Sequence, residues 1–274
     1  MSTADSHHAC SCGHDHGSHS RDHICWGGGQ AHHCRHELRL ENLSVSYGET
    51  AALCGINLSI PCGQTLALIG PNGAGKSTLL NALAGLLPRQ AACKGTMLWN
   101  GSELHHTRHE IAFMPQRSEV DWRFPLTVRE LVSMGRYPAL GAWGTMRQHD
   151  RDIIDKALTT LRLTELQNRQ IGELSGGQQQ RAFLARALAQ EAHILLLDEP
   201  FTGLDVPSMQ TLAELLRALA AEGRLIIASH HELATAADIF DQALLLRGRA
   251  VAFGSTAAVL SQENLSLTFT PAQA

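Results

Sequence analysis

The sequence of 274 residues has no long apolar run, little net charge and no secretory leader pattern. No stretch approaches the roughly 18 consecutive apolar residues that a membrane-spanning helix needs, so any membrane role would require docking onto partner proteins. A net charge of -4 with neutral histidines lacks the basic excess of nucleic-acid binders, and we expect no nucleic-acid partner. The N-terminus has no apolar segment behind a basic one, which makes the cytoplasm the expected compartment.

The seven cysteines do not suggest a disulfide framework. Their number is odd and the expected compartment is reducing, so metal binding or plain packing is favoured. Four of them lie within residues 1–36 together with nine histidines, and aliphatic side chains are almost missing there. Such a segment cannot build a hydrophobic core, so we predict a disordered, His/Cys-rich N-terminal tail.

This tail carries side chains of the types that bind zinc in proteins. Candidate ligands are Cys10, Cys12, His14 and His16. Thiolate sulfur and imidazole nitrogen match the preferences of Zn²⁺, whereas manganese prefers oxygen. The spacing matches no zinc finger, so the sequence predicts a flexible buffer, sensor or delivery arm. The alternative is a disordered tail that meets metal only incidentally.

From residue 37 to residue 274 the pattern is that of an α/β domain. Alternating or apolar segments predict strands over residues 38–46, 52–60, 65–69, 96–99, 111–114, 194–197, 225–229 and 243–246. Helical stretches separate many of them, which favours a largely parallel sheet covered on both faces. Residues from about 119 to 190 are expected to be mainly helical and to form a lobe inserted into this domain.

A glycine-rich phosphate-binding motif lies between an apolar strand and a helical run. Its residues are Gly70, Pro71, Asn72, Gly73, Ala74, Gly75, Lys76, Ser77 and Thr78, which fit G-x-x-x-x-G-K-[ST]. Glycine lets the backbone wrap closely around phosphates and turn several N–H groups inward. Lys76 is expected to reach the β- and γ-phosphates, while Ser77 binds Mg²⁺ and the helix N-terminus adds its positive dipole end. A chance glycine-rich turn is the alternative.

A second motif follows the apolar strand at residues 194–197. Asp198 and Glu199 come directly after it and are therefore expected at the carboxyl edge of the sheet. Asp198 is predicted to hold Mg²⁺ through water, and Glu199 to polarise the attacking water. Alone, the pair would indicate only an acidic strand terminus. Together with the phosphate-binding motif, it predicts an ATPase site.

A third motif lies between these two and comprises Ser175, Gly176, Gly177 and Gln178 after Leu174. By itself, a serine and two glycines before a helix form only a cap with an anion-binding N-terminus. In this order the three motifs resemble the ATP-binding subunits of ABC transporters, from residue 37 onward. The resemblance implies a P-loop NTPase core, similar to that of RecA, with an antiparallel β edge and an inserted helical lobe.

The resemblance also implies a partner and further site residues. Two subunits are expected to pair head to tail, with each ATP between the phosphate-binding motif of one and residues 175–178 of the other. Tyr47 falls where the family stacks an aromatic ring on adenine, with a half-buried strand tyrosine as the alternative. Gln116 matches the glutamine that contacts Mg²⁺ and water, or is a solvent-facing loop residue. Asp205 matches the acid of the loop that crosses the dimer interface.

Two adjacent histidines compete for one role in the resemblance. In the family, a histidine that contacts the γ-phosphate follows a strand and precedes an acid, as His230 and His231 both do. Aligning the following acid-leucine pair selects His231, and His230 remains the alternative.

Residues 114–128 and 134–137 resemble a narrower group, the ATPase subunits of manganese, zinc and iron importers. This implies polytopic membrane permease subunits as partners and, indirectly, a metal-binding extracytoplasmic protein. The chain would then lie at the cytoplasmic face of the inner (plasma) membrane. Trp122 and Phe124 follow Gln116, where the family receives the permease, so they are candidate anchors. The alternative is that they pack inside the helical lobe.

These features together predict the ATP-hydrolysing, energy-coupling subunit of an ABC transporter that imports zinc or manganese, with iron as a further candidate. ATP and Mg²⁺ are the expected cofactors, and Lys76, Glu199 and His231 the expected catalytic residues. The first alternative is a soluble ABC ATPase that acts as a scaffold without a membrane channel. The second is a metal-storage protein with a degenerate nucleotide fold, which the filled catalytic positions disfavour.

Overall fold

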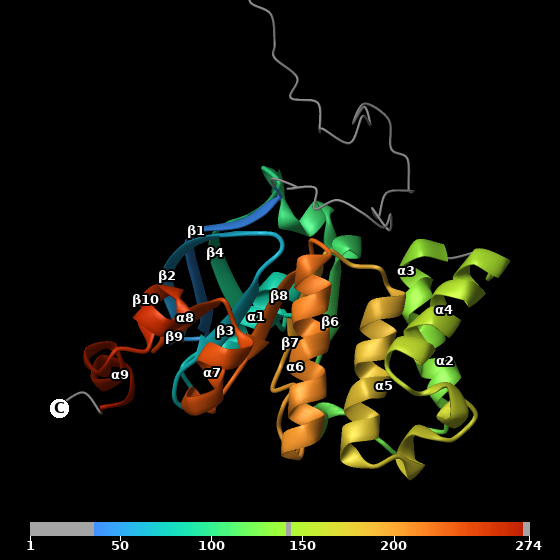
Figure 1. The fold of residues 1–274 in the computed structure, drawn as a ribbon. Helices are drawn as coiled ribbons and strands as arrows, with labels where there is room; N and C mark the ends of the chain where they lie inside the picture. Colours follow the sequence, from blue (N-terminus) through green and yellow to red (C-terminus); the bar gives the residue numbers. More distant parts are fainter. Residues whose placement is uncertain (1–35, 141–143, 271–274) are drawn as a thin grey trace, which may run out of the picture.

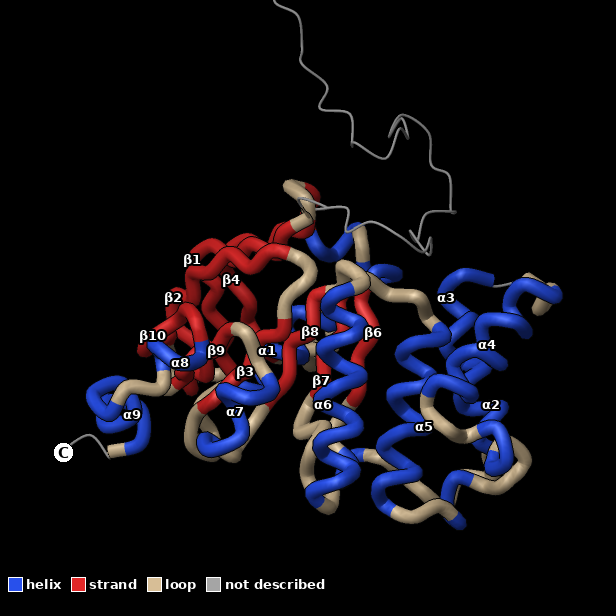
Figure 2. Tube along the Cα trace, in the orientation of Figure 1, coloured by secondary structure: helices blue, strands red, loops and turns tan. Residues whose placement is uncertain are grey.

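The computed structural model describes residues 36–140 and 144–270, which form two β-sheets with helices packed around them (Figure 1). The tube in Figure 2 separates a strand-rich half from a half that is almost entirely helical. The predicted zinc ligands Cys10, Cys12, His14 and His16 lie outside the described residues. Within the described ranges, no helix combines the length and the apolar character that a bilayer crossing demands.

The central sheet is six-stranded, with the strand order β10-β9-β3-β8-β7-β6. Its strands are β3 (Thr65–Ile69), β6 (Ile111–Met114), β7 (Ile194–Leu197), β8 (Leu225–Ser229), β9 (Gln242–Leu246) and β10 (Ala250–Ser255). Neighbours run parallel, except that β10 pairs antiparallel with β9 at the edge. This confirms the predicted parallel sheet with an antiparallel edge.

A second sheet is antiparallel throughout and extends the antiparallel part beyond the predicted edge. It has the order β2-β1-β4-β5 and consists of β1 (Glu37–Tyr47), β2 (Thr50–Pro61), β4 (Ala91–Trp99) and β5 (Ser102–Glu103). Along β1 and β2, buried positions alternate with more exposed ones. One face of this sheet therefore packs on the core while the other meets solvent, as antiparallel sheets permit.

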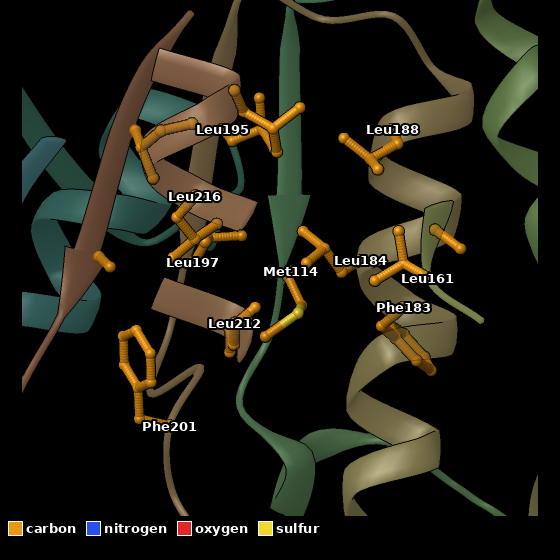
Figure 3. Close-up of a cluster of buried hydrophobic side chains, with 14 of the residues drawn as sticks. Met114, Leu161, Phe183, Leu184, Leu188, Leu195, Leu197, Phe201, Leu212 and Leu216 are labelled. Carbon is orange, nitrogen blue, oxygen red and sulfur yellow. The ribbon is translucent and has the colours of Figure 1, made fainter. Parts of the chain in front are cut away.

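The central strands send alternate side chains into two separate cores. In β7, Leu195 and Leu197 join the core formed with α5 and α6, whereas Ile194 and Leu196 join the core formed with α1 and the antiparallel sheet. The same alternation holds in β3, β8 and β9. Figure 3 shows Leu195 and Leu197 in the first core, near Met114. Because both faces are covered, these strands are continuous apolar runs.

The helices divide between the sheet domain and a lobe. The sheet domain holds α1 (Lys76–Ala84), α6 (Val206–Ala221), α7 (Leu233–Ile239), α8 (Thr256–Val259) and α9 (Gln262–Phe269), with the 3₁₀ turns η1 (Leu104–His106) and η2 (Arg108–Glu110). The lobe holds α2 (Val128–Ser133), α3 (Tyr137–Leu140), α4 (Gln148–Thr160) and α5 (Gly176–Ala189), with η3 (Arg117–Glu119), η4 (Met134–Arg136), η5 (Thr164–Leu166) and η6 (Ile171–Glu173). Figure 1 shows α5 between α6 and the remaining lobe helices.

A buried ion network holds the lobe together. Arg136 is 5% exposed, and its guanidinium contacts Asp150 Oδ1 at 3.0 Å and Glu191 Oε2 at 2.8 Å. It also donates to the carbonyl of Ala189 at 2.9 Å. Burial alone would raise the pKa of Asp150, but hydrogen bonds from Arg147 and Arg136 lower it. Since a buried charge is stable only when it is paired, this network ties α4 to the end of α5.

Two side chains proposed as docking anchors take different places in the lobe. Trp122 packs inside it, with its ring centroid 5.3 Å from that of Phe183. Phe124 is 58% exposed. The packing alternative therefore describes Trp122, while Phe124 stays available for a partner.

Candidate functional site

The phosphate-binding loop connects β3 to α1, and close contacts require its first and last glycines. Gly70 lies so near the carbonyl oxygen of Leu246 that a Cβ atom would overlap it. Gly75 is the N-cap of α1 with φ 97°, and a Cβ atom there would lie 2.5 Å from Leu53 Cδ2. A larger residue at either position would displace the loop, which agrees with the glycines of the motif.

Lys76 keeps its ammonium group inside this loop. Its Nζ atom donates to the carbonyl oxygens of Gly70 at 2.7 Å and Pro71 at 2.9 Å, and the residue is 7% exposed. Burial lowers the pKa of Lys76, while the negative charges of Glu199 and Asp198 oppose this shift. The loop therefore holds a largely desolvated cation beside two acids, where phosphate oxygens can replace the two carbonyls.

Asp198 and Glu199 follow β7 and are joined through one hydroxyl group from β8. Ser229 Oγ donates to Asp198 Oδ1 and accepts from the backbone N–H of Glu199, both at 2.6 Å. Asp198 is 4% exposed. Glu199 has a φ of 50°, in the left-handed region that is unfavourable for a residue with a side chain. The two hydrogen bonds of Ser229, one to each acid, therefore fix the orientation of Asp198 and Glu199 relative to each other.

The carboxylate of Glu199 gathers side chains from the loops after β6, β7 and β8. Its Oε2 atom accepts from Gln116 Nε2 at 2.7 Å and from Thr202 Oγ1 at 3.2 Å, and its Oε1 atom lies 2.6 Å from His231 Nε2. Burial alone would raise the pKa of Glu199, but the hydrogen bond and charge of His231, with the other two hydrogen bonds, lower it. Glu199 is thus kept ionised and oriented, as a group that polarises water must be.

The two adjacent histidines face different surroundings. His230 is 2% exposed, lies 3.0 Å from Thr235 Oγ1 through its Nε2 atom, and packs against the rings of Phe201 and Phe240. Burial lowers its pKa. The His231 side chain is 40% exposed and points at Glu199. This geometry favours His231 over His230 for contact with a bound nucleotide.

We expect His231→Ala to move the acidic limb of ATP hydrolysis to higher pH. His231 makes the largest contribution that lowers the pKa of Glu199, so without it the carboxylate is protonated at a higher pH. As the pH falls, the variant then loses its base sooner than the wild type. Measuring kcat against pH for both proteins checks this, and an unshifted acidic limb would contradict the assigned contact.

His230→Ala is the matched control for this experiment. It deletes a ring that packs in the core and leaves the contact between His231 and Glu199 in place. We expect its free energy of unfolding to fall by roughly 2–4 kcal/mol, as for other large buried side chains. Its acidic limb should match that of the wild type.

The motif of residues 175–178 opens α5 in the helical lobe. Ser175 is the N-cap, and Gln178 completes a capping box by accepting from the Ser175 backbone N–H at 2.9 Å. Gly176 and Gly177 form the first helical positions. The segment therefore presents a helix N-terminus, a ready site for an anion. Its capping bonds join members of the motif to each other.

Tyr47 and Asp205 lie apart from the Glu199 cluster. Tyr47 ends β1 and is half-buried against the core beside the antiparallel sheet. Asp205 caps α6, since its Oδ1 atom accepts from the backbone N–H of Ser208 at 3.1 Å. These hydrogen bonds from Ser208 lower the pKa of Asp205.

Three oxygen-bearing side chains have the chemistry to bind a Mg²⁺ ion. Ser77 lies exposed in the first turn of α1, and Asp198 ends β7 as a carboxylate. Gln116 turns its amide nitrogen to Glu199, so its amide oxygen is the atom that it offers to a cation. Hydroxyl, carboxylate and amide oxygens are the hard ligands that Mg²⁺ prefers.

Three residues around Glu199 were not predicted from the sequence. Ser229 links the two acids, Thr202 bonds the Glu199 carboxylate, and Gln180 Nε2 donates to the Glu199 carbonyl at 3.2 Å. Gln180 is 8% exposed, so it joins α5 to the acid from inside the molecule. The one signal for Ser229 is a polar residue at the carboxyl end of a buried strand.

Known proteins resemble this chain over most of its length. Residues 53–202 match the family model described as ABC transporter. The manganese transport system ATP-binding protein MntB of Bacillus subtilis is 42% identical over 232 residues, which cover 85% of this chain and 92% of that protein. The zinc transport system ATP-binding protein TroB of Treponema pallidum is 40% identical over 226 residues, covering 82% and 84%.

A solved structure gives the same result for the fold. An ABC transporter described as of the metal-chelate type, in an inward-facing conformation, matches with a TM-score of 0.72 and 32% identity over 85% of this chain and 89% of that chain. The segment matched by the family model contains the phosphate-binding loop, residues 175–178 and both acids. The chain therefore belongs to the ABC transporter family, as one of its ATP-binding subunits.

Proposed function

We propose that this chain is the ATP-hydrolysing, energy-coupling subunit of an ABC transporter that imports a transition-metal ion, zinc or manganese. The observation that carries hydrolysis is the convergence of Gln116, Thr202 and His231 on Glu199, beside the loop that holds Lys76. The metal class is supported by relatives named for manganese and zinc transport.

ATP binding uses the loop between β3 and α1. The β- and γ-phosphates take the place of the Gly70 and Pro71 carbonyls at Lys76 Nζ, while the N–H groups at the start of α1 face the phosphate oxygens. No acidic residue lies in the first turn of α1 to repel them. Tyr47 provides a ring for the adenine.

Hydrolysis depends on positioning and charge. Glu199 orients a water molecule toward the γ-phosphate and accepts its hydrogen bond. His231, whose Nε2 atom lies 2.6 Å from Glu199 Oε1, contacts the γ-phosphate. Ser77, Gln116 and Asp198 would hold Mg²⁺, which would offset the negative charge of the phosphates. Ser229 keeps Asp198 and Glu199 in register with each other.

A homodimer completes each site. Residues 175–178 present a helix N-terminus, and their capping bonds stay within the motif. This N-terminus can therefore bind a phosphate of the ATP that a second subunit holds. Asp205 is exposed at the start of α6, where it can meet the same partner. Catalysis on this scheme requires two chains.

Polytopic permease subunits dock on the helical lobe. Phe124 is exposed close after Gln116, so an aromatic anchor lies within ten residues of the Glu199 cluster. Docking there would hold the chain at the cytoplasmic face of the inner membrane, and a metal-binding extracytoplasmic protein would serve the permease from the other side. The composition offers no basic excess for nucleic acid.

We also propose that residues 1–36 bind zinc. The proposal rests on composition, because nine histidines and four cysteines occur among these residues. Cys10, Cys12, His14 and His16 are the ligands expected first.

The transport proposal is tested by reconstitution. Wild type and Glu199→Gln are each incorporated with the candidate permease in vesicles, and ATP hydrolysis is followed together with uptake of radioactive zinc and of radioactive manganese. We expect the wild type to hydrolyse ATP and to accumulate one of the two ions. The variant should lose both activities, because it keeps the shape but not the base.

Hydrolysis that drives uptake of neither ion would contradict the transport proposal and favour a scaffold without a channel. Uptake that persists in Glu199→Gln would contradict the assignment of the base. Copurification of the permease with both proteins is the control, since glutamine keeps the size and shape of the glutamate side chain.

A further inference from the structure

A group of metal-ligating side chains lies outside the nucleotide site. The donor atoms of Glu103, His105 and His106 all lie within 4.8 Å of one another, and the described ranges contain no other group of three or more such residues that meets this spacing. All three are exposed, so an ion can reach them from solvent. None takes part in the ATPase mechanism.

The backbone beneath this cluster is fixed. Glu103 belongs to β5 and pairs with β4, and the two histidines belong to η1. Leu104, which lies between Glu103 and His105 in the chain, is 2% exposed. Its carbonyl oxygen accepts from both the backbone N–H and the hydroxyl of Thr107 at 3.1 Å. The buried leucine and these two hydrogen bonds anchor the turn, which limits the backbone ordering that binding an ion would require.

The distances suit a single small ion. Glu103 Oε2 lies 3.0 Å from His105 Nδ1. The rings of His105 and His106, with centroids 3.8 Å apart, would have to turn away from each other for both to bind one ion. Two ligands bound at about 2.1 Å to a tetrahedral ion lie about 3.4 Å from each other. An ion can therefore replace the present contact between Glu103 and His105 with little movement.

Glu110, Trp99 and His193 form a second cluster, in which a carboxylate and an imidazole bond to the protein itself. Glu110 Oε2 accepts from Trp99 Nε1 at 2.5 Å and lies 3.4 Å from His193 Nδ1, and the Glu110 side chain is 24% exposed. Burial would raise the pKa of Glu110, but His193 and Trp99 lower it. This carboxylate is already satisfied by the protein, whereas Glu103 has one exposed imidazole partner.

We propose that Glu103, His105 and His106 form a surface site for Zn²⁺, with a water molecule in the remaining position. Two imidazole nitrogens and one carboxylate oxygen are a ligand set typical of zinc with an open position. The site precedes the amino end of β6, whereas Asp198 and Glu199 follow the carboxyl end of the parallel β7. It is therefore separate from the nucleotide site, and it does not depend on the transport function.

Crystals of the full-length protein soaked in a zinc salt test the site directly. We expect an anomalous scattering peak at the zinc edge between the side chains of Glu103, His105 and His106. The peak should be lost in the double variant His105→Ala/His106→Ala. It should remain in His109→Ala, which removes another exposed imidazole from the same segment. Absence of the peak in the wild type, or its persistence in the double variant, would overturn the proposal.

Zinc stoichiometry in solution gives a second readout. Residues 1–36 are the same in every protein compared, so their zinc cancels in the difference between two variants. Competition with a coloured chelator should find one zinc ion fewer per chain in the double variant than in the wild type, and no loss in His109→Ala. Equal stoichiometry in the wild type and the double variant would refute the site. Unchanged thermal unfolding without zinc shows that the exposed substitutions leave the fold intact.

Discussion

Glu199→Gln is expected to slow ATP hydrolysis by about 10³-fold, the middle of the range for general-base catalysis. Glutamine has nearly the same shape and can keep contacts with Gln116 and His231, but it carries no charge with which to polarise water. The affinity for ATP should be nearly unchanged, because the phosphate-binding loop is intact. Single-turnover hydrolysis and equilibrium binding of a nucleotide, measured on the same protein, separate the two quantities.

Glu214→Gln is the matched control for this substitution. Glu214 is an exposed carboxylate on α6, and its replacement should leave both hydrolysis and binding unchanged. If Glu199→Gln hydrolysed ATP at the wild-type rate, another group would have to activate the water. If it lost ATP binding as well, the contacts of Glu199 would have to be structural.

Lys76→Ala is expected to weaken ATP binding by about 100-fold, because two charge-assisted hydrogen bonds to phosphate contribute about 3 kcal/mol. The free energy of unfolding should change little by comparison, since the ammonium bonds only to loop carbonyls in the protein alone. Titration calorimetry with ATP and a denaturant unfolding curve measure the two effects on one preparation.

Two further variants sharpen this result. Lys94→Ala removes an exposed lysine from β4 and should bind ATP like the wild type. Lys76→Arg keeps the charge but enlarges a side chain that is 7% exposed, so it should not restore affinity. Wild-type affinity in Lys76→Ala would contradict the assignment of Lys76 to the phosphates.

Most of the central sheet could be predicted from the sequence because its strands are buried on both faces. β3, β6, β7 and β8 appear in the sequence as continuous apolar runs, which predict strands with the bounds that the structure shows. β10 and α9 were not predicted. β10 is half-buried and interrupted by Gly254, and α9 buries only Thr268 completely, so neither has a clear hydrophobic period.

The parts of the candidate site that depend only on the order of residues in the sequence could be predicted. The parts that depend on which way a side chain points could not. The phosphate-binding motif and the acid pair are each an unbroken run of residues, so each can be located in the sequence by its pattern alone. Nothing in the order of residues shows that Trp122 packs inward against Phe183 while Phe124 is exposed. The same holds for Ser229, whose role exists only because β8 lies beside β7.

The alternation of each central strand between two cores constrains how the chain length can vary in evolution. An insertion or deletion of one residue within β7 would exchange the side chains facing α6 with those facing α1. Asp198 and Glu199, which follow the strand, would then each point to the face of the sheet that the other faces now. The buried acid and the water-facing acid would then trade places. Across relatives of this chain we therefore expect length differences to fall in the connections, and the parity of β7 to be kept.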